Sequence, residues 1–115
     1  MEHLKGARGK DGRLLTADTY RRLHKGQRIS SNNRDEYALG WMSFHRPWAK
    51  GAGRDDTGRC LHHAGSNNSW YALVWIAPER DFAVLAATNI GGEGIFNRID
   101  AVIGAVIRDY IGRLE

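Results

Sequence analysis

The chain of 115 residues has one cysteine and two prolines, and it contains no long apolar run. A single cysteine excludes an internal disulfide and any zinc site built from several cysteines. No stretch approaches the roughly 18 uncharged apolar residues that span a bilayer, so we expect no contact with a membrane. The first residues carry charge with no hydrophobic stretch behind it. This predicts no signal peptide and, for the chain as it stands, a cytoplasmic location.

Several catalytic signatures are also missing. No serine is followed three residues later by lysine, and G-x-S-x-G does not occur. There is no phosphate-binding loop, and G-G-E-G at 91–94 is too short for a dinucleotide fingerprint. His62 and His63 are adjacent, so in a strand their side chains point to opposite faces and cannot chelate one metal ion. We therefore expect no cofactor and no metal site.

The residues that are present suit one small domain. Hydrophobic residues make up 42% of the chain, with four Trp, four Tyr and three Phe, which is enough apolar surface for a core. We therefore expect a single domain over 1–115. Cys60 is expected to be a small core residue in a strand.

Positive charge is concentrated at the start of the chain. Residues 1–34 carry nine Lys or Arg against three Asp or Glu, whereas the remainder carries eight against ten, which gives a net charge of +4. These cations are dispersed, and within 1–34 only Tyr20 is placed to stack on a base. We expect no nucleic-acid partner.

The first 36 residues predict loops and one short helix. Residues 6–13 are glycine-rich and indicate a loop or tight hairpin, and residues 26–36 are polar and indicate a second loop. Between them, Thr16 can cap a helix over 17–24 that ends at Gly26. Its buried residues would be Leu15, Tyr20 and Leu23.

The rest of the chain predicts a sheet followed by a helix. Strands are expected at 37–44, 59–63, 69–77 and 82–89, within a sheet region of 37–90, with a short connection at 78–81. A long helix is expected over 95–114, because apolar residues recur there at helical spacing. Its buried residues would be Ile95, Ile99, Val102, Ile103, Val106 and Tyr110. The predicted fold class is α+β, with an antiparallel sheet of about four strands and the C-terminal helix packed on one face.

The 69–77 strand is apolar on both faces. Alternation places Trp70, Ala72, Val74 and Ile76 on one side and Tyr71, Leu73, Trp75 and Ala77 on the other. Such a sheet needs cover on both sides, and the C-terminal helix covers one. We therefore expect that the chain self-associates, that it is a piece of something larger, or that a loop folds over the open face.

A family resemblance rests on four motifs in order. They are Y-A-L-G-W at 37–41, L-H-H-A-G-S-N at 61–67, P-E-R-D at 78–81 and T-N at 88–89, followed by the C-terminal helix. This order resembles the C-terminal portion of the serine β-lactamase and penicillin-binding-protein superfamily, in its esterase- and peptidase-like branch. The match runs over roughly 37–112, and 11–24 resembles the segment that leads into it. The resemblance implies a partial β-lactamase/transpeptidase-like fold.

The resemblance also implies site residues. His63-Ala64-Gly65 matches H-x-G, which replaces K-T-G as the third motif in many esterase-like members. His63 would take the basic position of that motif, and Gly65 would let substrate approach the backbone. The Ser66 backbone N–H would be an oxyanion-hole donor, and Asn67 would line the cleft. A histidine in place of lysine favours ester or peptide substrates over lactams. The alternative is that His63 is an ordinary strand histidine.

The rest of the family's catalytic machinery is absent from these 115 residues. The family needs a nucleophilic serine with lysine one helical turn later, a second motif with Tyr or Ser, and a helical domain between them. We therefore expect the chain alone to be inactive. It would be a truncated gene product, an artificially shortened chain, or a separately encoded half that handles ester, peptide or lactam substrates only with a complementing N-terminal half. Family members are often periplasmic or secreted.

A second hypothesis is a non-catalytic binding or assembly module. It would use the open sheet face for a partner, and a homodimer is one form of this.

Overall fold

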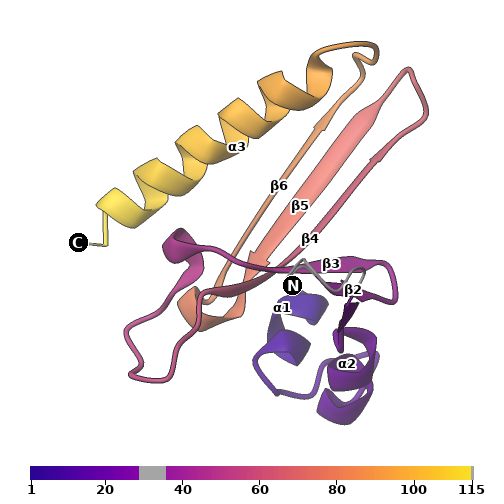
Figure 1. Cartoon of the computed structure of the whole chain (residues 1–115). Coiled ribbons are helices and arrows are strands. Elements are labelled where there is room, and N and C mark those ends of the chain that lie inside the picture. Colours follow the sequence, from indigo (N-terminus) through magenta and orange to yellow (C-terminus); the bar gives the residue numbers. More distant parts are fainter. Residues whose placement is uncertain (29–35, 115) are drawn as a thin grey trace. The chain divides into compact units, whose positions relative to one another are not determined.

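Antiparallel pairing joins six consecutive strands into one sheet, in the order β1-β2-β3-β4-β5-β6. The computed structural model describes residues 1–28 and 36–114 (Figure 1). The helices are α1 (Glu2–Ala7), α2 (Ala17–Leu23) and α3 (Ile95–Gly112), with short 3-10 turns η1 (Pro47–Ala49) and η2 (Pro78–Arg80). The strands are β1 (Gln27–Arg28), β2 (Glu36–Ala38), β3 (Trp41–His45), β4 (Arg59–Ser66), β5 (Tyr71–Ala77) and β6 (Phe82–Thr88). No helix in the described part of the chain is long and apolar enough to cross a membrane.

The α+β class, the C-terminal helix and the short helix capped by Thr16 are confirmed, but the strand count is wrong. The stretch 37–44 is two strands, because Ala38 pairs with Trp41 across a two-residue turn. Gly40 has φ of +84°, a left-handed conformation that glycine adopts without steric cost. The polar stretch 26–36 contributes β1 and the start of β2, and its residues 29–35 lie outside the described part.

Helix α1 was not predicted, since the glycines at 6–13 indicated a loop from residue 6. The loop begins only after Ala7. Gly6 is buried in the helix, and a Cβ there would lie 2.0 Å from the Tyr20 ring. The glycine therefore serves the contact between α1 and α2, which pack together (Figure 1). In α2, Tyr20 is buried as expected, whereas Leu15 is exposed because it precedes the helix.

The chain divides into two compact units, and β4, β5 and β6 contribute to both. Unit 1 is Met1–His63 with Trp75–Ala83, and unit 2 is Ala64–Val74 with Val84–Glu115. In unit 1, Ala49, Cys60 and Ala77 form a fully buried cluster. Half-buried aromatic side chains pack against it: Phe44, Trp48, Trp75 and Phe82. Cys60 is thus a core residue in a strand, as predicted, and burial raises its thiol pKa to about 12.

Two acidic side chains fix the turn between β5 and β6 within unit 1. The Glu79 carboxylate accepts hydrogen bonds from the backbone N–H groups of Thr57 (3.0 Å) and Gly58 (2.8 Å). Burial raises its pKa, but these N–H donors outweigh burial and hold the pKa below its usual value. Asp81 forms an ion pair with Arg8, the residue that follows α1. The P-E-R-D sequence therefore ties the 57–58 loop and α1 to this turn.

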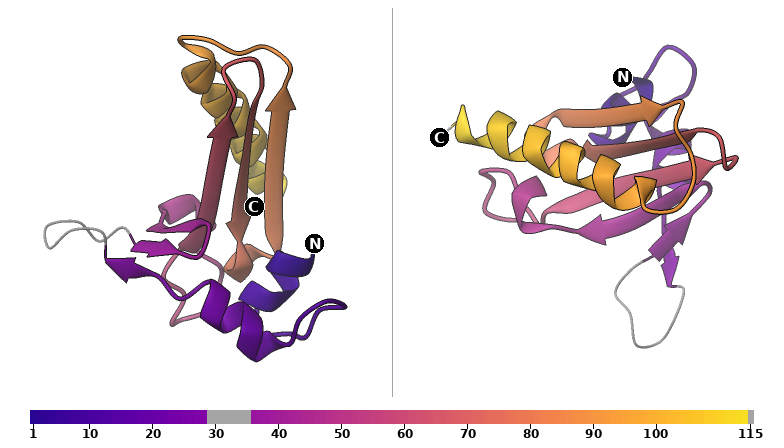
Figure 2. Two further views of the ribbon diagram at one scale, coloured as in Figure 1. Left: turned by 90° about the vertical axis from the view of Figure 1, so that its right-hand side faces the viewer. Right: turned by 90° about the horizontal axis from the view of Figure 1, so that it is seen from above.

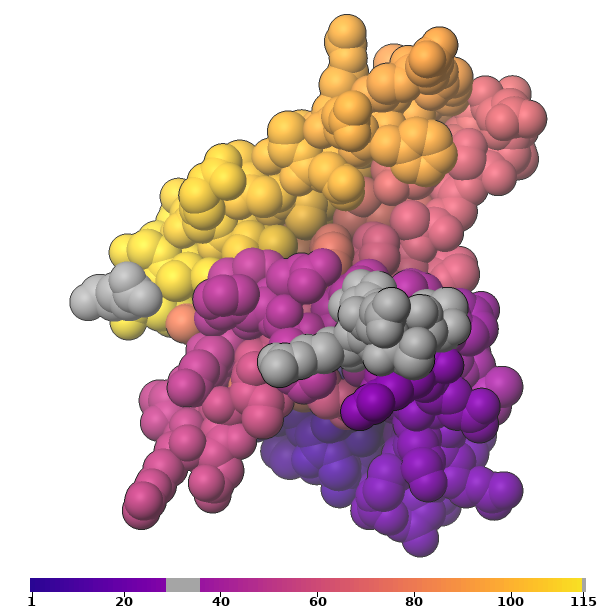
Figure 3. All heavy atoms as spheres, viewed as in Figure 1, coloured from indigo at the N-terminus to yellow at the C-terminus, as the bar shows by residue number. Residues whose placement is uncertain are grey.

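In unit 2, α3 lies beside the strand segments (Figure 2), and Phe96 contacts the Tyr71 ring edge-on with centroids 4.5 Å apart. The buried residues of α3 are Ile95, Ile103 and Ile107. Val102 and Val106, which were predicted to be buried, are 54% and 44% exposed, and the helix presents its outer side chains as an open surface (Figure 3, orange to yellow). The buried residues are spaced by multiples of four along the helix and therefore form one narrow row on its surface. Ile107 belongs to this row, whereas Val106, which was predicted to be buried, lies beside it.

The strand segments of unit 2 are buried on one face and exposed on the other. Tyr71 and Leu73 are each 3% exposed, whereas Trp70 is 58% and Leu85 is 74% exposed. Along β6 the half-buried and exposed residues alternate strictly. Within this unit, one face of the sheet therefore remains open.

A pair of histidines in unit 1 makes stability depend on pH. His24 is 2% exposed, and its Nε2 lies 2.9 Å from Nδ1 of His3. Its own Nδ1 is buried without a partner among the described residues. Burial, followed by the charges of His3 and Arg59, lowers the His24 pKa from 6.5 to about 4. In the protonated ring both nitrogens carry a proton, so the buried Nδ1 is an N–H without an acceptor among the described residues, whichever tautomer the neutral ring has.

We predict that stability falls as pH decreases through the window between the two pKa values of His24. The unfolded chain binds this proton near pH 6.5 and the folded chain near 4, so the contribution of His24 is complete above about 6.5 and lost progressively down to about 4. The slope is at most about 1.4 kcal/mol per pH unit. Urea unfolding at several pH values measures it. His24→Gln should flatten the curve in this window and His45→Gln, at an exposed position, should not; equal slopes for all three proteins would refute the assignment.

Candidate functional site

The predicted site residues His63–Ser66 form the last four residues of β4, on a strand edge that β3 leaves uncovered. The pairing of β3 with β4 runs from His45 opposite Arg59 to Met42 opposite His62. Beyond His62, β4 continues to Ser66 with β5 as its neighbour on the other edge. The strand is longer than the predicted 59–63. The H-x-G triplet therefore lies in regular strand structure.

The turn that joins β4 to β5 determines which way the Ser66 backbone points. The N–H of Asn67 donates to the Trp70 carbonyl at 3.4 Å, so this pair is hydrogen-bonded across the turn. In an antiparallel ladder, hydrogen-bonded and non-hydrogen-bonded pairs alternate. Ser66 is next along β4, so its N–H and C=O point away from β5, toward the edge that β3 does not cover. The donor predicted for an oxyanion hole thus lies at an edge where no described strand pairs with β4.

Gly65 has open space where a side chain would be. A Cβ placed there meets no atom of the described residues within 4 Å, and its φ is not positive. Neither steric crowding nor backbone conformation therefore requires glycine within this part of the chain. The described structure therefore leaves room for another molecule or segment to approach the backbone at this position.

Side chains of Ser66 and Asn67 hold the turn. The Ser66 hydroxyl donates to the Trp70 carbonyl (2.8 Å) and accepts from the N–H of Asn68 (3.1 Å). The Asn67 Oδ1 accepts from the N–H groups of Ser69 (3.2 Å) and Trp70 (2.9 Å). Asn68 takes the left-handed conformation at φ +71°. Because the Ser66 hydroxyl is engaged in the turn, it is poorly placed to act as a nucleophile.

A shallow hollow of about 190 Å³ lies beside the triplet. Gly65, Ser66 and Asn67 line it together with Trp70, Tyr71 and Ala72 of β5 and Ala87 and Thr88 of β6. Its walls are largely apolar. Of the residues predicted to bind substrate, Gly65 and Asn67 both line the hollow, whereas Ala64 does not. His63, predicted to take the basic position of the motif, does not line it either. Ala64 is half-buried and His63 is exposed.

The two adjacent histidines point in opposite directions, as the strand pleat predicts. His62 stacks on Trp75 with ring centroids 4.2 Å apart, on the side of Phe44. His63 is exposed one residue further along. His62 therefore belongs to the aromatic cluster of unit 1, and His63 is accessible to solvent. Within the described residues no group of three or more His, Cys, Asp or Glu side chains is arranged to hold a metal ion.

Two other arrangements of polar groups were not predicted from the sequence. One is the buried contact of His3 with His24, near Trp41. The other is a cavity of about 420 Å³ that Arg59 lines at the start of β4. Both join residues distant in sequence, and neither follows a motif.

Comparison of the chain with family models, with curated proteins and with solved structures finds no match.

We predict that Asn67 stabilises the β4–β5 turn. Asn67→Ala removes an oxygen that accepts two backbone N–H groups, which should lower the free energy of unfolding by about 1–3 kcal/mol. Chemical denaturation measures the change. The matched control is Asn97→Ala on the exposed side of α3, which should change stability by less than about 0.5 kcal/mol. Equal effects of the two substitutions would show that the turn does not depend on this side chain.

Proposed function

We propose that the chain is the C-terminal portion of a β-lactamase-related serine hydrolase and that it provides one wall of an acyl-transfer site. The observation that carries this proposal is the H-x-G triplet on a strand edge that no described strand covers. The Ser66 N–H is directed off that edge, and no described atom fills the space at Gly65. Two further features support it. They are the consecutive order β4, β5, β6 and α3, and the P-E-R-D turn between β5 and β6.

In this proposal each residue of the edge has a separate task. Two hydrogen-bond donors at fixed positions stabilise the oxyanion that forms when a nucleophile attacks an ester or amide carbonyl. The Ser66 N–H is one of them, and Gly65 leaves room for the carbonyl to approach it. His63 is accessible at the same edge and would orient the substrate. Asn67 shapes the turn beside the cleft.

The nucleophile must come from elsewhere, because no S-x-x-K occurs in these 115 residues. A serine activated by a neighbouring lysine would form the acyl-enzyme, which water then hydrolyses. The chain alone lacks the group that attacks, so it should accelerate hydrolysis very little.

The test begins with the DNA upstream of the codon for Met1. We predict that it encodes S-x-x-K, and that the encoded polypeptide expressed together with this chain is labelled by a fluorescent fluorophosphonate and hydrolyses a chromogenic ester. Gly65→Val should reduce kcat/KM at least about tenfold, because it fills the approach to the edge. Folding should be unaffected, because the space at Gly65 is open within the described chain.

Ala83→Val is the matched control, since it adds similar bulk at an exposed position of β6 and should leave turnover unchanged. Three results would overturn the proposal: no upstream S-x-x-K, a co-expressed pair that does not react, or equal turnover with Gly65→Val. Ester hydrolysis by the chain alone that His63→Ala abolishes would also overturn it, because the nucleophile would then lie in this chain.

A second candidate function, an assembly module that pairs with a second copy, is favoured by the open face of unit 2. Trp70 and Leu85 are large apolar side chains left in water there. We predict concentration-dependent self-association by sedimentation equilibrium, which Leu85→Lys should weaken. Leu14→Lys, at a similarly exposed leucine in unit 1, should leave association unchanged. A protein that stays monomeric and binds no apolar dye would exclude this function.

A further inference from the structure

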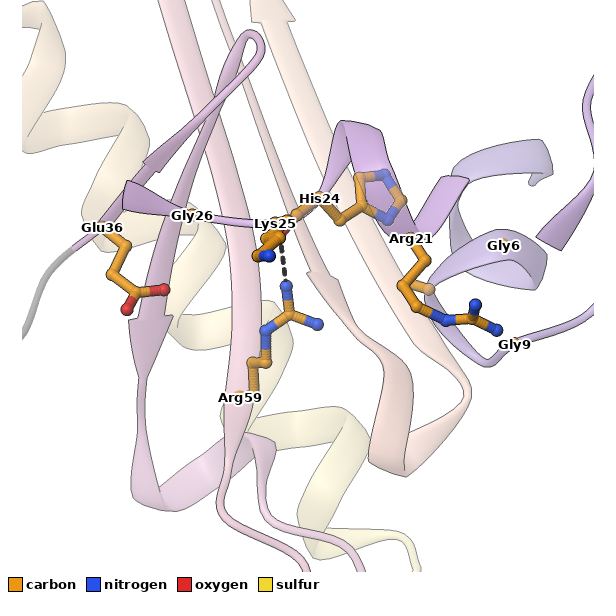
Figure 4. Close-up of a pocket in the computed structure, with 9 residues that line it drawn as sticks. Gly6, Gly9, Arg21, His24, Lys25, Gly26, Glu36 and Arg59 are labelled. Atoms are coloured by element: carbon orange, nitrogen blue, oxygen red, sulfur yellow. Dashed lines mark hydrogen bonds between the residues drawn. The ribbon is translucent and has the colours of Figure 1, made fainter. Parts of the chain in front are cut away.

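A cavity of about 420 Å³ in unit 1 is lined mainly by charged and small residues. It lies among the end of α1, the end of α2, the first residue of β2 and the first residue of β4. Its charged side chains are Arg21, Lys25, Glu36 and Arg59, shown in Figure 4. Its position is separate from the H-x-G edge.

Arg59 is the central group of this cavity. Its side chain is half-buried on β4, and Nη2 donates to the carbonyl of His24 at 2.6 Å. Its Nε makes a longer contact of 3.4 Å with the Ser43 hydroxyl. Both acceptors are neutral. Among the described residues, no carboxylate lies within ion-pair distance of the guanidinium. A full positive charge is therefore partly withdrawn from water without a counter-charge.

The other charges of the cavity do not neutralise Arg59. Lys25 is exposed and makes no ion pair within the described part of the chain, whereas Arg21 is paired with Asp18. Among the described residues of the lining, Glu36 is the one carboxylate. Figure 4 shows the Arg59 guanidinium between Glu36 and Arg21, with one Nη directed at the end of α2 and the other directed away from it. The described part of the lining thus keeps an excess of positive charge.

Helix capping explains part of this arrangement. Cations near a helix C-terminus are favourable, and the contact of Arg59 with the His24 carbonyl is of this kind. That contact uses one of the five N–H donors of the guanidinium. Helix capping does not explain why the second Nη of Arg59 is directed away from the helix end. It also does not explain why Lys25 lines the cavity. The volume is also within the range of about 300–1,000 Å³ that is usual for small-molecule sites.

We propose that this cavity binds a small organic anion through its carboxylate or phosphate group. The planar guanidinium of Arg59 receives two oxygens of that group, and the ammonium of Lys25 supplies the second charge. This site does not rest on the hydrolase proposal, because it shares none of the edge residues 63–67.

The test uses two anions with the same apolar part and a neutral analogue. Phenyl phosphate, benzoate and benzyl alcohol are titrated into the chain at about 0.15 M salt, where unspecific attraction to surface charges is largely screened. Calorimetry and the amide signals of residues 21–26 follow binding. We expect saturable binding of at least one anion and none of benzyl alcohol. The anion that binds identifies whether phosphate or carboxylate is the natural group.

Lys25→Gln is the decisive variant, because Lys25 is exposed and its side chain supports no other contact that the structure describes. It should weaken binding about tenfold, which corresponds to about 1.4 kcal/mol. Lys50→Gln, an exposed lysine outside the cavity, should bind as the wild type does. Arg59→Lys keeps the charge but loses the planar fork, and it should bind more weakly still. The proposal is overturned if neither anion saturates, or if Lys25→Gln binds with wild-type affinity.

Discussion

Within the described part of the chain, strand β4 has neighbouring strands on both edges along its first half and on one edge along its second half. The limit is set by β3, which is five residues long and begins just after the Gly40 turn. Where both edges are paired, Cys60 and Leu61 are fully buried. Where β3 no longer covers the edge, β4 exposes His63, Gly65 and Ser66. One strand therefore serves as core in its first half and as an accessible edge in its second half, and the position of one glycine turn separates the two.

The sequence predicted those parts of the fold that long patterns determine. The 69–89 hairpin and the C-terminal helix rest on many apolar residues each, and the Thr16 cap rests on a local hydrogen bond that the structure contains. The split at Gly40 was missed because one residue's φ decides it within an otherwise strand-like run. Helix α1 was missed because the reason for Gly6 is its contact with Tyr20, which is distant in sequence. On α3 the apolar stripe is wider than the buried row, so periodicity alone could not separate Val106 from Ile107.

The candidate site was predictable to a similar degree. The predicted strand ended at His63, so only the first residue of the H-x-G triplet was expected on a strand, whereas β4 continues to Ser66. The adjacent histidines were expected on opposite faces, because pleating alternates side chains. The roles of Ser66 and Asn67 side chains in the turn were not foreseen, since they depend on the short connection between β4 and β5. The Arg59 cavity gave no signal at all. An arginine at the start of a strand resembles any surface arginine until α2 is seen to end beside it.

The basic excess of residues 1–34 has local uses in the fold. Arg8 pairs with Asp81, and Arg21 pairs with Asp18. Lys25 has no carboxylate partner in the described structure. It lines the same cavity as the half-buried Arg59, which belongs to the part of the chain that carries a net negative charge. These two ion pairs account for part of the positive charge of this segment. A compact anion could contact both Lys25 and Arg59 at once, because both line the same cavity, and this is the geometry that the proposed anion site uses.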